Sequence, residues 1–134
     1  MLKFSKKVDY GLILLSKLRE EGEAASAREI AKRYNLPQSM VANILKSLAT
    51  SGILTSTRGA QGGYEMARQA KEISLADVVE ALEGPLSLVE CSAGKMDCKF
   101  IELCPTHDPL QMIHKKFEEF MAGLTIDQIL EARP

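Results

Sequence analysis

Aromatic residues and long apolar runs are scarce in this sequence of 134 residues. It has no tryptophan, three tyrosines and four phenylalanines, which leaves little surface for stacking nucleobases and argues against a single-strand binder. No apolar run approaches the roughly 20 residues that span a bilayer, and residues 1–7 lack the apolar stretch of a signal peptide. We therefore expect a cytoplasmic protein that does not contact membranes.

Recognisable catalytic motifs are also missing from the sequence. Nothing resembles a nucleophile beside its base or a pair of carboxylates in a pocket. The glycine-rich stretch 59–63 lacks the lysine and the serine or threonine that complete a phosphate-binding loop. We expect neither an enzyme nor a small-molecule substrate.

Charge is divided unevenly along the chain. Residues 1–72 hold 12 Lys and Arg against 7 Asp and Glu, and residues 73–134 hold 5 against 11. The halves therefore carry +5 and −6, which sum to the net charge of −1. A basic N-terminal half indicates a polyanionic partner, and the acidic half indicates a different role.

Apolar periodicity and capping signals predict a mainly α fold with a small β-hairpin. A helix, a short helix, a tight turn, a third helix and a hairpin in this order are typical of a winged helix-turn-helix domain. We expect this DNA-binding domain at 1–83, a cysteine-containing loop at 84–107, and a long dimerisation helix with a short C-terminal helix at 108–134. The expected helices are 5–20, 27–34, 37–51, 75–82 and 108–122 with a short one after residue 125, and the expected strands are 53–57 and 64–67.

The third helix and the hairpin turn carry the residues expected to contact double-stranded DNA. Polar side chains on the helix can bind base edges and phosphates, and an arginine in the turn can enter a narrow minor groove. Glycines beside that arginine let the backbone approach closely. The alternative is an ordinary solvated surface. The expected contacts are Gln38, Ser39, Met40, Asn43 and Lys46 on the helix, and Arg58, Gly59 and Gly62 in the turn.

All three cysteines lie within 14 residues, with the spacing Cys91-x6-Cys98-x5-Cys104 and a histidine at His107. An odd number of cysteines argues against a disulfide framework. Thiolates with one imidazole suit zinc or an iron–sulfur cluster, and gaps of six and five residues fit a cluster better than the two to four usual in zinc fingers. A metal-free thiol switch and an inert loop are the alternatives.

The long helix near the C-terminus predicts a homodimer. Its apolar residues recur at intervals of 3, 4, 3 and 4, which makes two a/d heptads and calls for a partner helix. A two-fold dimer would present two recognition helices to a palindromic operator. The alternative is that this stripe packs on its own domain. The expected dimerisation residues are Leu110, Ile113, Phe117, Phe120 and Leu124, whereas His114 is interpreted as structural or solvated.

The sequence resembles the iron–sulfur cluster regulator superfamily of winged-helix repressors, which includes IscR, NsrR and RirA. The matching stretches are residues 5–10, the wing 58–64, the helix 75–82, the three cysteines and the tail 124–126. The resemblance implies a homodimer with crossing C-terminal helices and a cluster in the loop before them. It implies Cys91, Cys98 and Cys104 as cluster ligands and Arg58 as the minor-groove residue, and its wing motif adds Tyr64 to the expected DNA contacts.

The same resemblance offers two candidates for the fourth cluster ligand. His107 matches the histidine of the IscR branch, which holds a [2Fe–2S] cluster. Asp9 matches an aspartate that the partner subunit contributes to a [4Fe–4S] cluster in the NsrR branch. We prefer His107, because its spacing is local and imidazole is the better-matched ligand. The sequence departs from the IscR branch in two ways. Its first cysteine gap is one residue longer, and Ala42 stands where that branch has an acidic base-reading residue.

These observations lead to one main hypothesis for the function. The chain is expected to be an iron–sulfur cluster-dependent transcription repressor that senses cluster status, redox state, nitric oxide or iron. One alternative is a zinc- or thiol-based redox-responsive winged-helix protein without a cluster. Another is a partner-binding module that does not act on DNA.

Overall fold

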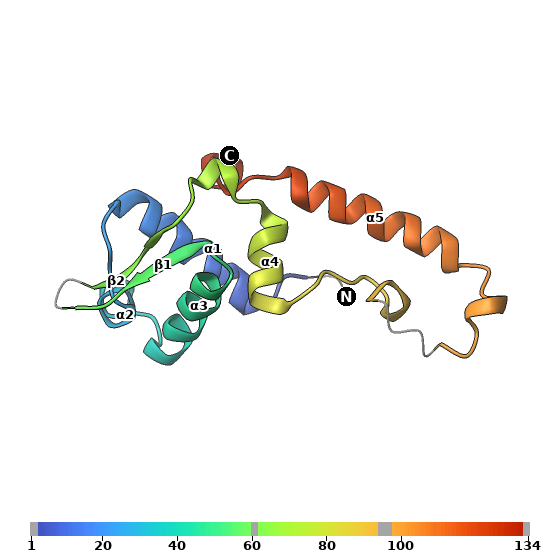
Figure 1. Ribbon diagram of the computed structural model, residues 1–134, viewed down its shortest axis with the longest axis horizontal. Helices are drawn as coiled ribbons and strands as arrows, with labels where there is room; N and C mark the ends of the chain where they lie inside the picture. The colour runs from blue at the N-terminus through green and yellow to red at the C-terminus, as the bar shows by residue number, and fades with distance from the viewer. Residues whose placement is uncertain (1–2, 60–61, 94–97, 133–134) are drawn as a thin grey trace.

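The computed structural model describes residues 3–59, 62–93 and 98–132 (Figure 1). It is mainly helical with a two-stranded antiparallel hairpin, so the predicted fold class is confirmed. The elements are α1 (Lys6–Glu21), α2 (Ala27–Tyr34), α3 (Gln38–Thr50), β1 (Leu54–Thr57), β2 (Gly63–Met66), η1 (Ala70–Glu72), α4 (Leu75–Glu83), η2 (Glu90–Ala93), η3 (Ile101–Leu103), α5 (His107–Gly123) and α6 (Ile126–Glu131).

The predicted helices and strands are all present, with stated ends that differ by at most one residue. The segment 84–107, predicted as one loop, contains the short 3-10 helices η2 and η3. In the described part of the chain, no helix has the length and apolarity needed to cross a bilayer.

Two parts of the molecule are visible in its outline. Helices α1 to α4 and the hairpin gather into a body, while α5 and the chain that precedes it extend from this body as an arm (Figure 1). The core of the body is built from aliphatic side chains that are almost fully buried, and each contributes roughly 1.5–3 kcal/mol by leaving water. The largest include Leu14, Leu15, Ile30, Ile44, Leu45, Leu48, Ile53 and Ile73.

The C-terminal end of the chain returns to the body. Met121 of α5 and Ile126 of α6 are buried in the core. The Ile126 N–H donates to the Ile73 carbonyl, and the Leu75 N–H donates to the Leu124 carbonyl, both at 2.8 Å. The end of α5 and the start of α6 therefore share the core of the N-terminal region. The division of the chain into regions 1–83, 84–107 and 108–134 stays a prediction.

Local hydrogen bonds set the angle between α2 and α3. The Ser26 side chain and Glu29 form the expected capping box at the start of α2. At its end Asn35 adopts a left-handed conformation (φ 53°), and the Leu36 N–H donates to the Ala31 carbonyl at 2.9 Å. Asparagine tolerates this conformation better than most residues, so the turn between the helices is encoded locally.

The wing is anchored to the body through β2. The Tyr64 N–H donates to the Ala25 carbonyl at 2.7 Å, and the Ala25 N–H donates back to the Tyr64 carbonyl at 3.0 Å. This exchange brings the backbone of Ala25 against Gly63, where an added Cβ would lie 2.3 Å from the Ala25 carbonyl carbon. Only glycine fits at position 63.

A polar cluster joins α1 to α2. The Tyr34 hydroxyl and Arg33 both donate to Oε1 of Glu21 at 2.5 Å, and the Lys17 ammonium lies 5.5 Å from the centre of the Tyr34 ring. The hydrogen bond from Tyr34, with further help from Arg33, holds the pKa of the Glu21 carboxyl below its ordinary value. The carboxylate therefore stabilises the packing of the helix-turn-helix on α1.

We expect Glu21→Gln to lower the free energy of unfolding by about 1 kcal/mol at pH 7. Because the folded pKa is depressed, this contribution is complete above the unfolded pKa of about 4.3 and is lost as the pH falls through the folded value. Urea unfolding of the wild type and the variant between pH 7 and pH 3 measures this gap, the difference between their free energies of unfolding. The exposed Glu23→Gln is the control, and a gap that stays constant down to pH 3 would contradict the assignment.

We expect Gly63→Ala to destabilise the protein by about 1–3 kcal/mol, because the methyl group must displace the Ala25 backbone. Gly123→Ala is the matched control, since a Cβ at that helix end meets nothing within 4 Å. Thermal unfolding of both variants measures the difference. Equal melting temperatures for the two would show that the wing is not held in this way.

Candidate nucleic-acid interface and cysteine loop

The outer face of α3 presents most of the polar residues expected to contact DNA. Gln38, Ser39, Asn43 and Lys46 are exposed. Ser39, Asn43 and Lys46 are spaced by four and three residues, which places them on one face of the helix. Met40 differs from this group, because it is half-buried and packs against the core. Its place in the predicted interface is therefore at the edge of the polar face.

The wing places Arg58 directly after β1. Arg58 and Gly59 are exposed, and Gly59 has a φ of +123°, a conformation that favours glycine. The Gly62 N–H donates to the Gly59 carbonyl at 3.0 Å and closes the turn, while residues 60 and 61 of the turn lie outside the described part of the chain. Tyr64 is half-buried and packs against the core, so part of its side chain serves the fold.

Several basic side chains of the body are held by carboxylates. Arg33 pairs with Glu21 and Arg68 with Asp77. Lys46 and Arg58 form no ion pair with any described residue, and both are exposed. Free positive charge is therefore present on the recognition helix and in the wing, where phosphates of a duplex would lie.

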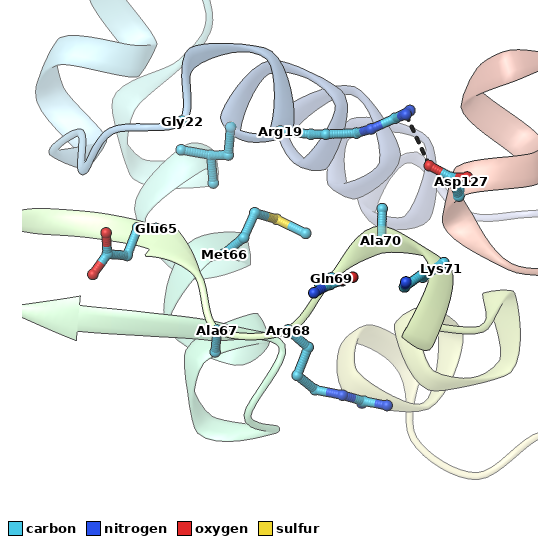
Figure 2. Close-up of a pocket in the computed structure, with 11 residues that line it drawn as sticks. Arg19, Gly22, Glu65, Met66, Ala67, Arg68, Gln69, Ala70, Lys71 and Asp127 are labelled. Carbon is cyan, nitrogen blue, oxygen red and sulfur yellow. Dashed lines mark ion pairs between the residues drawn. The ribbon is translucent and has the colours of Figure 1, made fainter.

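A surface groove of about 480 Å³ lies on the body between the end of α1, β2 and η1 (Figure 2). Arg19 borders this groove and pairs with Asp127 of α6 at 2.8 Å. No sequence motif indicates this groove, because it forms where elements distant in the chain meet. Arg19 and Asp127 neutralise each other there, Arg68 pairs with Asp77, and the expected DNA contacts lie elsewhere.

The cysteines lie in the arm, and all three have free thiols. Cys91 and Cys104 are half-buried, and Cys98 is exposed. The Gln111 side-chain amide of α5 donates to the Cys91 sulfur at 3.6 Å. η2, which contains Cys91, therefore lies against the first half of α5.

Cys104 and His107 flank the start of α5. The Cys104 sulfur lies 3.3 Å from the Thr106 hydroxyl, and hydrogen bonds from that hydroxyl and from the backbone N–H groups of Thr106 and His107 lower the pKa of the thiol. His107 Nδ1 lies 2.9 Å from the Asp108 carboxylate. A thiol with a lowered pKa is closer to the thiolate that binds metals.

The predicted metal ligands are not gathered in this conformation. Among the residues that the structure describes, no three His, Cys, Asp or Glu side chains are close enough to hold a metal ion. Residues 94–97, between Cys91 and Cys98, lie outside the described part. Asp9 is exposed on α1, an element of the body, whereas the cysteines lie in the arm. The chemistry of the thiols and His107 suits a cluster, but binding one requires the loop to rearrange.

The expected dimerisation residues differ in burial. Ile113 and Phe120 are 49% and 60% exposed, as unpartnered dimer contacts would be. Phe117 and Leu124 are half-buried against the core of their own chain, and Leu110 is half-buried. One edge of this apolar stripe therefore packs on the body, and the other edge is exposed.

His114 is buried. The sequence alone allowed either a structural or a solvated residue at this position. Its side chain is only 9% exposed, and Nε2 lies 3.3 Å from the Glu118 carboxylate. The position of His114 in the sequence is consistent with this burial, because it falls at helical intervals from the apolar residues Leu110, Phe117 and Met121. It is the one charged or polar residue found in the buried class in the described part of the chain.

Comparison with known proteins agrees with this architecture. The chain is 33% identical to protein aau3 of Rhizobium meliloti over 135 residues, which cover 99% of this chain and 88% of that protein. It is 32% identical to protein rrf2 of Nitratidesulfovibrio vulgaris over 96% of this chain and 91% of that protein. The structure of T. potens IscR matches with a TM-score of 0.69 and 27% identity over 97% of this chain and 87% of that one.

The profile of the Rrf2 family, described as an iron-dependent transcriptional regulator, matches residues 4–132. This range includes the recognition helix, the wing, the three cysteines and α5. The resemblance inferred from the motifs is thereby confirmed at the level of the superfamily. The chain belongs to the Rrf2 family of transcriptional regulators.

Proposed function

We propose that this protein is a repressor whose affinity for a palindromic double-stranded operator is set by an iron–sulfur cluster in the cysteine loop. The observation that carries the proposal is the placement of three free thiols on an arm that is anchored in the core of the DNA-binding domain. The description of the family as iron-dependent supports the choice of iron.

DNA binding is assigned to α3 and the wing. Asn43 and its exposed neighbours on α3 would read base edges in the major groove, and Lys46 would meet a phosphate. Arg58, free of any ion pair with the described residues, would enter the adjacent minor groove. Two such units, related by the predicted pairing of α5 helices, would match a palindrome.

The cysteine loop is assigned to sensing. Cys91, Cys98 and Cys104 would hold the cluster with either His107 or Asp9 of the partner subunit as the fourth ligand, which corresponds to a [2Fe–2S] or a [4Fe–4S] cluster. When bound, the cluster would supply sensitivity to iron, redox state or nitric oxide. The thiol of Cys104 is favoured as a ligand because its hydrogen bonds already stabilise the thiolate.

A continuous set of contacts connects this loop to the DNA-binding residues. Cys91 accepts a hydrogen bond from Gln111 of α5. α5 packs against α4 and inserts Met121 into the core, and α4 packs against α3. A shift of η2 on α5 can therefore change the placement of the recognition helix, and a coupling of about 1–3 kcal/mol would change operator affinity roughly 5- to 150-fold.

Arg58→Ala is expected to weaken binding to an operator selected from a random duplex library by roughly 5- to 150-fold, and to reduce the salt dependence by about one counterion. Lys115→Ala is the control, because it also removes one exposed positive charge, but from α5 in the arm. Fluorescence anisotropy at several salt concentrations measures both. Equal losses in the two variants would reduce the effect to net charge and remove Arg58 from the interface.

Anaerobic reconstitution with iron and sulfide is expected to give visible absorption between about 300 and 600 nm. Each of the variants Cys91→Ser, Cys98→Ser and Cys104→Ser is expected to lose this absorption. Loss of the cluster in His107→Ala, but not in Asp9→Ala, would identify His107 as the fourth ligand, and the opposite result would identify Asp9. Iron and sulfide counts separate two irons from four. A colourless protein that binds zinc, or no metal, would overturn the proposed cofactor in favour of a zinc or thiol sensor.

A further inference from the structure

Among the described residues of the arm, two buried polar side-chain atoms have no hydrogen-bond partner. They are Nδ1 of His114 on α5 and Oγ of Ser92 on η2. Buried polar groups are hydrogen-bonded in the great majority of cases, so an unpaired one calls for an explanation. Here the two atoms lie on two elements that pack against each other.

The contact between His114 and Glu118 determines what Nδ1 can do. Nε2 lies 3.3 Å from the Glu118 carboxylate, and this negative charge favours the neutral tautomer that carries its proton on Nε2. Nδ1 is then a bare acceptor, and a hydroxyl can donate to it. The Ser92 hydroxyl is a donor without an acceptor, so the two atoms are chemically complementary.

Both residues lie close in the chain to a contact between η2 and α5 that involves Cys91. The Gln111 amide donates to the Cys91 sulfur at 3.6 Å, and Ser92 is the next residue of the same 3-10 helix. Gln111 and His114 are three residues apart on α5, so they lie on the same face of the helix. A shift of η2 that separates Cys91 from Gln111 would also move Ser92 relative to this face of α5.

We propose that Ser92 and His114 form a latch: the Ser92 hydroxyl donates to His114 Nδ1 when Cys91 is released from Gln111 to become a ligand. The inference rests on the proposed cofactor and adds a positioning pair to it. In the conformation described, both atoms are desolvated without compensation. With Cys91 held as a ligand, the Ser92 hydroxyl would donate to His114 Nδ1, and this new hydrogen bond between η2 and α5 would connect the state of the loop to the arm.

The latch predicts that Ser92→Ala changes the melting temperature in opposite directions in the metal-free and the cluster-loaded protein. In the metal-free protein the variant removes an unpaired buried hydroxyl, so its melting temperature is expected to rise by roughly 2–6 °C. In the reconstituted protein it removes a hydrogen bond, so the melting temperature is expected to fall. A side chain with a merely structural role would shift both states in the same direction, and that result would overturn the proposal.

Two variants of His114 separate its two nitrogen atoms. His114→Asn keeps an acceptor near the position of Nδ1, and His114→Gln keeps a polar group near Nε2. We expect His114→Gln to reduce the ratio of operator affinities between loaded and metal-free protein by about 5- to 10-fold, and His114→Asn to retain most of it. Combining Ser92→Ala with His114→Gln is expected to add no further loss, whereas a loss equal to the product of the two would show that no bond joins them.

A variant of Gln111 allows the proposed hydrogen bond to be tested without the cofactor. Gln111→Leu releases Cys91 without any metal. In this background, Ser92→Ala and His114→Gln are expected to show a non-additive effect on unfolding, and in the wild-type background additive effects. If wild-type protein takes up no iron or sulfide, the proposed cofactor fails and this cycle still decides the latch. Additive effects in both backgrounds would overturn it.

Discussion

The burial of Met121 and Ile126 in the core of the helix-turn-helix body is the constraint on which the rest of the structure depends. These two side chains flank the junction of α5 and α6, and the backbone of Ile73 and Leu75 holds the same junction by hydrogen bonds. The arm therefore leaves the body from a fixed point. In the proposed mechanism, this anchor connects the cysteine loop to α3.

The body and the arm differ in how well their polar groups are satisfied. In the body, capping boxes at Ser26 and Ser74 and the Glu21 cluster pair the groups that helix ends and packed helices would otherwise leave free. In the described part of the arm, two buried atoms are unpaired, and the Cys91 and Cys104 thiols contact Gln111 and Thr106. The proposed mechanism therefore assigns the change of conformation to the arm and the presentation of α3 and the wing to the body.

Much of this architecture could be predicted because its signals are local. Capping boxes, the proline after Leu36 and the glycines of the wing each act within a few residues, so the helices and hairpin were predicted within one position. The exposed face of α3 followed from helical periodicity. The burial of His114 could not be settled in this way, because helical spacing does not show which edge of the apolar stripe on α5 the body covers. For the same reason, the assignment of Phe117 and Leu124 to a dimer seam alone was incomplete.

The sequence by itself determined the class of fold, the family motifs and the residues with the right chemistry for DNA and for metal. These properties depend on residue type and short-range spacing, which act before the chain is compact. Only the tertiary structure decided that α6 shares the core, that Gly63 must be glycine against Ala25, and that Cys91 rests on Gln111. Each of these joins residues far apart in the chain, because burial and close packing depend on which surfaces meet and not on the sequence of either surface alone.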